Sequence, residues 1–373
     1  MLGAALALSL PLAELVLRGV APQKLPSQEE IRSYVIQGMY VADARAGYRP
    51  TPGFSGRLER DGHVTDFSTN AAGLRGAEIG PKTKRRILAL GDSMTWGWGV
   101  SQGEEWIHTV GREVTRLGGL EIESLNGGVN GYGTANELAR LEDLGPALSP
   151  DLVLLGFFPN DYADNLLGTT GAYTVRDGYL FDLASEAWFR EHWLARHSHL
   201  WRLGAAATET YRVRYAGGVP NTRPGRRLRP EELQQGMELS LQHIRRMETV
   251  AGSLGARLAV VWLPPVAYTL AGSRPEDIPL QRELQGRVAA AGIPSLDLLP
   301  TLTAEPGREG LYIRGDGHFT ARGHRVAGRA VGSWVVQAQL LAARARAEAL
   351  APSSPPPLGA GTRVLPRGRT PVS

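Results

Sequence analysis

Short apolar runs alternate with amphipathic stretches through the middle of the chain. The run at 87–90 contains no polar residue, which is typical of a strand buried on both faces of a parallel sheet. Further strands are expected at residues 120–125, 151–158, 257–263 and 293–299. Helices are expected at residues 104–117, 135–144 with Thr134 as N-cap, 231–254, 279–291 and 321–349 with Thr320 as N-cap. This alternation predicts an α/β fold, a doubly wound, flavodoxin-like parallel sheet of about five strands with helices on both faces.

The remaining segments divide the chain further. Residues 21–84 are expected to form an N-terminal extension that packs on the core and includes a hairpin at 57–69 with an Asp-Gly turn. The main domain is expected at 85–340, with an insertion at about 162–229 that interrupts the alternation. The aromatic and apolar residues of the insertion predict a helical cap, which could line a pocket. They are Trp188, Phe189, Trp193, Leu194, Leu200, Trp201 and Leu203.

The first 20 residues have two interpretations. Residues 1–13 are nearly all apolar, and Glu14 and Arg18 then interrupt the run. A bilayer span needs about 20 apolar residues and a secretory signal needs a basic start, and neither condition is met. The segment is either the end of a membrane anchor whose beginning is missing or a helix that packs on the domain. We favour the anchor and a membrane-anchored or extracytoplasmic location, although Arg18 and Lys24 after the apolar run argue against export, so a cytoplasmic location stays open.

The charge of the chain is concentrated in its tail. Residues 341–373 are expected to contain the end of the last helix and a disordered Arg/Pro-rich segment. Their five arginines and one glutamate account for the whole net charge of +4 of the 373-residue chain. A formally neutral body argues against nucleic-acid binding, which needs a basic face. The chain has no cysteine, which excludes disulfides and thiolate metal sites.

Polar loops come directly after three of the expected strands, and a fourth precedes the last helix. They lie at 91–93, 126–134, 160–161 and 314–320. In a doubly wound sheet such loops converge at one edge. Acyl transfer needs a hydroxyl nucleophile, a base to take its proton and donors for the oxyanion. Ser93, His318, a glycine N–H of 126–134 and the Asn160 amide are candidates for these parts, whereas Asp92 and Ser93 could also merely shape a turn.

The other histidines carry weaker signals. His192, His197 and His199 lack the spacing of a known zinc motif, so they are expected on the surface of the cap, and no metal or cofactor is expected. His324 is expected on the last helix, and Asp161 is expected to be structural. Structural roles are also expected for His63, His108 and His243.

Four motifs together resemble the SGNH (GDSL-type) hydrolase family. They are GDSMTWG at 91–97, NGGVNGYGT at 126–134, FPND at 158–161 and DGHFTARGH at 316–324, in the order of the family. The resemblance implies that Ser93 is the nucleophile and contributes its N–H to the oxyanion hole. It implies further donors in Gly131 and Asn160, and the base in His318.

Two positions depart from the pattern of that family. Phe158 stands where the family usually has a glycine two residues before the asparagine. The acid usually lies three residues before the histidine, where this chain has Gly315, so we expect Asp316 to orient the imidazole from a loop. The alternative is a Ser-His dyad in which Asp316 only shapes a turn.

These observations favour a serine esterase that hydrolyses carboxylic esters, among them O-acetyl groups of a polysaccharide or a lipid. An O-acyltransferase could use the same residues with a sugar hydroxyl as acceptor. The departures at Phe158 and Gly315 leave a non-catalytic glycan-binding or assembly protein open as well. The expected partners are a small-molecule or glycan ester and, through the N-terminal segment, a membrane.

Overall fold

The computed structural model describes residues 2–23, 36–60, 63–169, 173–183, 192–215, 228–274 and 278–342. The chain divides into two units, Met1–Leu341 and Ala342–Ser373, and the fold and the site both belong to the first. The expected tail from 343 onward lies outside the described residues, as do Trp188 and Phe189 of the insertion.

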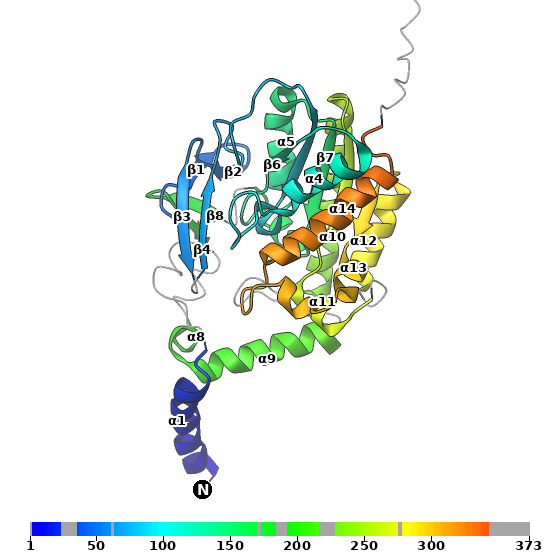
Figure 1. The fold of residues 1–373 in the computed structure, drawn as a ribbon. Coiled ribbons are helices and arrows are strands. Elements are labelled where there is room, and N and C mark those ends of the chain that lie inside the picture. The colour runs from blue at the N-terminus through cyan, green and yellow to red at the C-terminus, as the bar shows by residue number, and fades with distance from the viewer. Residues whose placement is uncertain are drawn as a thin grey trace, which may run out of the picture. The chain divides into compact units, whose positions relative to one another are not determined.

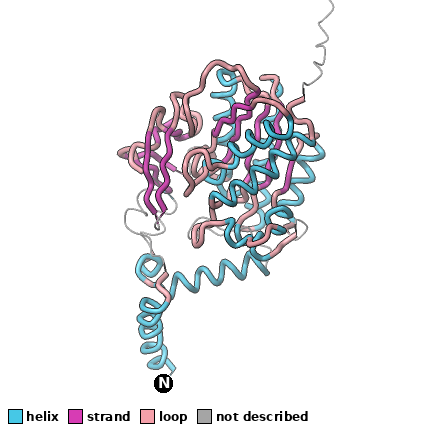
Figure 2. The backbone as a smooth tube through the Cα atoms, viewed as in Figure 1, coloured by secondary structure: helices cyan, strands magenta, loops and turns pink. Residues whose placement is uncertain are grey.

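A parallel sheet forms the centre of this unit (Figures 1 and 2). Its five strands are β5 (Arg85–Gly91), β6 (Ile122–Asn126), β7 (Leu152–Phe157), β10 (Arg257–Trp262) and β11 (Ser295–Asp297). They lie in the order β11-β10-β7-β5-β6. Counted along the chain this is the 2-1-3-4-5 order of flavodoxin-like folds, so the predicted fold is confirmed. The order reverses between β5 and β7, and such folds bind their ligands beyond the carboxyl ends of the strands at this point.

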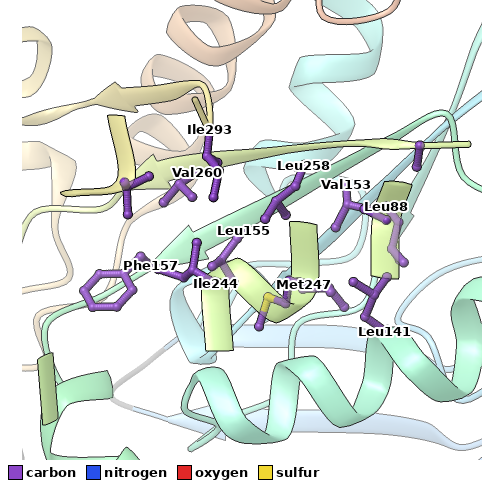
Figure 3. Close-up of a cluster of buried hydrophobic side chains, with 14 of the residues drawn as sticks. Leu88, Leu141, Val153, Leu155, Phe157, Ile244, Met247, Leu258, Val260 and Ile293 are labelled. Carbon is purple, nitrogen blue, oxygen red and sulfur yellow. The ribbon is translucent and has the colours of Figure 1, made fainter. Parts of the chain in front are cut away.

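Two apolar layers cover the two faces of the sheet, which explains the uninterrupted apolar run in β5. Its side chains alternate between the layers: Leu88 and Leu90 pack with one group of helices, whereas Ile87 and Ala89 pack with the other. The first group, part of which Figure 3 shows, consists of α5 (Thr134–Leu148), α10 (Pro230–Ser253) and α12 (Pro279–Ala290). The second consists of α4 (Trp106–Gly118) and α14 (Ala321–Gln337), which lie side by side (Figure 1).

The ends of two helices test the expected caps. Thr320 caps α14, because its hydroxyl accepts a hydrogen bond from the Gly323 N–H at 3.2 Å. The prediction of Thr134 as a cap was wrong: Gly133 is the N-cap of α5 and Thr134 is its first residue. The Thr134 hydroxyl instead contacts Nδ1 of His243 at 3.0 Å, so a tertiary contact replaced the local one. Helix α14 ends at Gln337, earlier than expected.

The extension and the insertion both contain hairpins. At the position of the expected hairpin, β3 (Ser55–Arg60) and β4 (His63–Ser68) pair antiparallel, with Arg60 opposite His63, and residues 61–62 lie outside the described residues. A second hairpin in the extension joins β1 (Tyr40–Asp43) to β2 (Gly47–Pro50). The insertion holds helices and also the hairpin β8–β9, which packs on β1 and β2. Its elements are α6 (Asp161–Asn165), β8 (Tyr173–Arg176), β9 (Tyr179–Asp182), α8 (Trp193–His197) and α9 (His199–Tyr215).

The N-terminal segment forms helix α1 (Leu2–Val20), which contacts α9. The Glu14 carboxylate accepts hydrogen bonds from the backbone N–H groups of Leu200 at 2.8 Å and His199 at 2.9 Å. The hydrogen bond from Leu200 has the largest effect, and together these bonds lower the pKa of Glu14 to about 2. Among the described helices, none has the length and apolar character that a bilayer crossing requires.

Candidate active site

Ser93 lies immediately beyond the carboxyl end of β5, as the first residue of the short helix α3 (Ser93–Trp96). The side chain of Asp92 caps this helix by accepting a hydrogen bond from the Met94 N–H at 2.8 Å. Glycine is required at position 91 because its φ is +153° and a Cβ there would lie 2.1 Å from Oγ1 of Thr95. The first N–H groups of a helix have no partner within it, so the Ser93 N–H is available to a ligand.

His318 reaches Ser93 from a loop 225 residues further along the chain. A bridge between Tyr312 and Phe319 closes this loop, and the Ile313 N–H donates to the His318 carbonyl at 2.8 Å. The imidazole Nε2 lies 2.7 Å from Oγ of Ser93. This distance is that of a hydrogen bond, so the two predicted residues meet in the structure.

Asp316 lies at the other nitrogen of the same imidazole. Its Oδ1 contacts Nδ1 of His318 within hydrogen-bond distance and also accepts a bond from the His318 backbone N–H at 3.2 Å. Gly315 and Gly317 flank it with φ values of +76° and +93°, which bend the loop enough for residues two apart to meet. With the proton on Nδ1 directed at Asp316, Nε2 is left as an acceptor for the Ser93 hydroxyl.

The loop that carries Gly131 runs along the end of β5. The backbone N–H groups of Gly127 and Val129 donate to Ala89 and Gly91 at 2.8 and 2.9 Å. Gly131 has a φ of +79°, and a Cβ at this position would lie 2.7 Å from the ring of Tyr173. The loop therefore passes beside the turn that holds Ser93, with no room for a side chain at Gly131.

Asn160 lies beyond β7 at the same edge and is the N-cap residue of α6. Its Nδ2 donates to Oδ2 of Asp164 at 3.0 Å, and its side chain also hydrogen-bonds Asp92. Its Oδ1 is buried and has no hydrogen-bond partner among the described residues. The amide is thus fixed next to the Ser93 turn, and any oxyanion would share its hydrogens with these two carboxylates.

Four buried carboxyl groups lie close together beneath this edge, those of Asp92, Glu137, Asp161 and Asp164. Burial raises the pKa of Asp92 to about 6. Hydrogen bonds from Met94 and Asn160 and the charge of His318 act in the opposite direction and limit this rise. Burial and mutual repulsion raise the pKa values of Glu137 and Asp161 well above the usual range. Among the described residues, no group of three or more His, Cys, Asp or Glu side chains could hold a metal ion.

His324 lies on the last helix, as expected, and its environment is structural. It is 1% exposed, and burial lowers its pKa to about 3. Its Nδ1 accepts a hydrogen bond from the backbone N–H of Trp106 at 3.2 Å, which ties α14 to α4. The imidazole of His324 is therefore neutral near pH 7 and holds two helices together.

Three residues near the site had no sequence signal. The buried guanidinium of Arg75, in the extension, donates to the Gly97 carbonyl at 2.7 Å and pairs with Glu105 at 2.6 Å. It thereby fixes the loop that places the Trp98 ring 6.3 Å from the imidazole of His318. Tyr48, also in the extension, contacts the glycine-rich loop through its hydroxyl. Single Arg, Trp and Tyr residues in such stretches have no spacing that would identify them.

A hollow of about 470 Å³ borders the loop that carries His318. Its lining combines apolar and polar side chains from the extension, from the loop after α3 and from the loop before α14. The lining residues include Val64, Thr65, Glu104, Ile313 and Arg314.

The family model of the GDSL-like lipase/acylhydrolase family matches residues 89–326, which include all four polar loops at the edge of the sheet. The chain belongs to this family. The resemblance found in the motifs is thereby confirmed, and the protein is an ester hydrolase. No curated protein matches the chain.

Solved structures of the family share little sequence with this acylhydrolase. A lipase/acylhydrolase from Enterococcus faecalis is 16% identical, with 68% of this chain and 96% of that chain covered and a TM-score of 0.40. A member of the lipolytic G-D-S-L family from Veillonella parvula is 14% identical, with coverages of 69% and 100% and a TM-score of 0.39. The psychrotrophic esterase EstA from Pseudoalteromonas sp. is 12% identical, with coverages of 69% and 98% and a TM-score of 0.38.

Proposed function

We propose that this acylhydrolase is a serine esterase with Ser93 as nucleophile, His318 as base and Asp316 as the orienting acid. The observation that carries the proposal is the continuous contact from Asp316 through the imidazole to Oγ of Ser93, with Nε2 at 2.7 Å.

In the first half of the reaction, Oγ of Ser93 attacks the ester carbonyl carbon while Nε2 of His318 takes its proton. The carbonyl π electrons move to the oxygen, which the N–H groups of Ser93 and Gly131 and the amide of Asn160 stabilise. Collapse of this tetrahedral intermediate breaks the bond to the alkoxy oxygen, which leaves with the proton from His318. Ser93 is then acylated.

In the second half, water attacks the acyl carbon as His318 takes one of its protons. Collapse of the second intermediate breaks the bond to Oγ of Ser93, and the proton returns to that oxygen. Asp316 stays ionised and holds the imidazole in the tautomer that both halves need.

The test is hydrolysis of p-nitrophenyl acetate by substituted proteins. Ser93→Ala is expected to reduce turnover by up to ~10⁶-fold. Asn160→Ala is expected to reduce it by ~10²–10³-fold and leave measurable activity, because it removes one donor of several. Ser253→Ala, at an exposed serine at the end of α10, controls for the loss of a hydroxyl. Turnover by Ser93→Ala at the wild-type rate would reject the proposal.

The substrate proposal is a short acyl ester, such as an acetyl group, of a polar alcohol such as a sugar. Glu104 and Arg314 support it, because both residues line the hollow next to the loop of His318 and are suited to hydroxyl groups. Acetylated oligosaccharides should then give a higher kcat/KM than p-nitrophenyl esters of long fatty acids. The opposite ranking would reject this substrate class.

The acyl acceptor decides between hydrolysis and transfer. A labelled acetyl ester incubated with a glycan is expected to release labelled acetate, whereas label on the glycan would identify an O-acyltransferase. Fluorophosphonate should label Ser93, because the reagent needs an activated hydroxyl. Glycan binding without such labelling would instead identify the non-catalytic alternative.

Membrane attachment through α1 is also proposed. It is supported by the exposure of Leu12, Leu15 and Val20, which are 63%, 72% and 81% exposed, and of Trp193 on α8 at 61%. The protein is expected to sediment with vesicles of phosphatidylcholine and phosphatidylglycerol, and Leu15→Asp should weaken this binding. Leu117→Asp, at an exposed leucine of α4, is the matched control. Equal sedimentation of both variants would reject the attachment through α1.

A further inference from the structure

Tyr48 belongs to the extension and lies outside residues 89–326, which the family model matches. It is nevertheless buried, at 1% exposure, against the glycine-rich loop of the site. Its hydroxyl donates a hydrogen bond to the backbone carbonyl of Asn130 at 2.7 Å. Burial raises the pKa of Tyr48 well above 10, so the hydroxyl keeps the proton that it donates.

The carbonyl that Tyr48 contacts belongs to the same peptide unit as the N–H of Gly131. A peptide unit is planar, so a bond that fixes its oxygen also fixes the direction of its N–H. A hydrogen bond to the carbonyl oxygen also polarises the unit and makes its N–H a stronger donor. The Tyr48 hydroxyl therefore acts on the donor of Gly131 without touching a substrate.

The surroundings of Tyr48 leave this peptide unit little freedom to rotate. The Asn130 side chain donates to the Tyr40 hydroxyl at 3.0 Å, and the Tyr132 hydroxyl donates to the Tyr48 carbonyl. The ring of Tyr48 packs edge-on against those of Tyr40 and Tyr132, with centroids 5.5 and 5.2 Å apart. On the other side, a Cβ at Gly131 would lie 2.9 Å from the Tyr48 hydroxyl.

We infer that Tyr48 is a positioning residue of the oxyanion hole: its hydroxyl orients and polarises the peptide that carries the Gly131 N–H. The inference rests on the proposed function, in which Gly131 is an oxyanion donor. It makes the N-terminal extension a part of the active site.

The test compares Tyr48→Phe with Tyr179→Phe. Each substitution removes one phenol hydroxyl that donates a hydrogen bond, but only the first removes the bond to the peptide of Gly131. Tyr48→Phe is expected to lower kcat by about tenfold with KM within about twofold of wild type, while Tyr179→Phe stays near wild type. Both should melt at similar temperatures. Replacement of Tyr48 by 4-aminophenylalanine, which keeps a donor at that position, should restore the rate.

Two inhibitors separate positioning from a general loss of structure. A trifluoromethyl ketone forms a tetrahedral oxyanion on Ser93, so its inhibition constant should rise by the same factor as kcat falls in Tyr48→Phe. The corresponding secondary alcohol has no carbonyl, and its inhibition constant should not change. Equal weakening of both inhibitors, equal rates for Tyr48→Phe and Tyr179→Phe, or no rescue by 4-aminophenylalanine would overturn the inference.

The Ser93→Ala variant separates a failure of the role inferred for Tyr48 from a failure of the proposed function. If Ser93→Ala is inactive and Tyr48→Phe is fully active, only the role of Tyr48 is rejected. If Ser93→Ala is active, the proposed function and the role of Tyr48 are both rejected.

Discussion

The buried carboxyl group of Asp92 predicts an unusual dependence of stability on pH. Its pKa is raised from 3.8 to about 6, chiefly because burial penalises the charged form. The folded protein therefore holds a proton at Asp92 that the unfolded chain releases. The stabilisation that this bound proton gives the folded state is fully present below pH 3.8. It is lost as the pH rises through about 6.

The size of the effect is set by this pKa difference. At 1.36 kcal/mol per pKa unit, ionisation of Asp92 destabilises the folded state by about 3 kcal/mol at pH 7.5 but by only about 0.5 kcal/mol at pH 4. Asp92→Asn cannot ionise, and its side-chain oxygen can still accept the hydrogen bond from Met94 that caps α3. The substitution should thus stabilise the protein at pH 7.5 by roughly 2–3 kcal/mol more than it does at pH 4.

Urea unfolding of wild type and Asp92→Asn, monitored by tryptophan fluorescence at the two pH values, measures this difference. Asp66→Asn, at an exposed carboxylate of β4, controls for the loss of one charge. A difference in unfolding free energy between wild type and Asp92→Asn that is the same at both pH values would contradict the prediction. It would mean that Asp92 ionises equally easily in the folded and the unfolded chain.

Three further substitutions have defined outcomes. Asp316→Asn should lower kcat by ~10²–10⁴-fold, because the amide does not hold the imidazole in the required tautomer, and an unchanged kcat would favour the dyad. Gly131→Ala should abolish p-nitrophenyl acetate hydrolysis, since its φ is +79° and a Cβ would lie 2.7 Å from Tyr173; activity within about tenfold of wild type would argue against this role. Arg75→Met should lower the unfolding free energy by about 3–5 kcal/mol in urea, because it leaves Glu105 buried without its partner. Arg75→Met combined with Glu105→Gln should recover part of that loss, and no recovery would show that the pair is not the cause.

Local patterns in the sequence predicted most of the central domain. An apolar run such as 87–90 has few structural solutions besides a strand buried on both faces, and amphipathic spacing marks the helices between such runs. The sequence also predicted that Ser93 and His318 would meet, because polar loops at the strand ends and before the last helix converge at one edge of a doubly wound sheet and because the four motifs resemble one family. Thr320 shows that a local cap can be predicted, whereas Thr134 shows that a tertiary contact can displace one.

The contacts that hold the site in place are visible only in the folded protein. Tyr48 lies 82 residues before Asn130, and Arg75 contacts the loop after α3 only because the extension folds back onto the domain. Such contacts have no periodicity along the chain, since their spacing is fixed by packing in space rather than by the geometry of a helix or a strand. The raised pKa of Asp92 is hidden from the sequence for a related reason, because burial by surrounding elements determines it. Local sequence patterns thus specify the elements and the chemistry at their ends, whereas packing in three dimensions selects the partners and the burial that tune that chemistry.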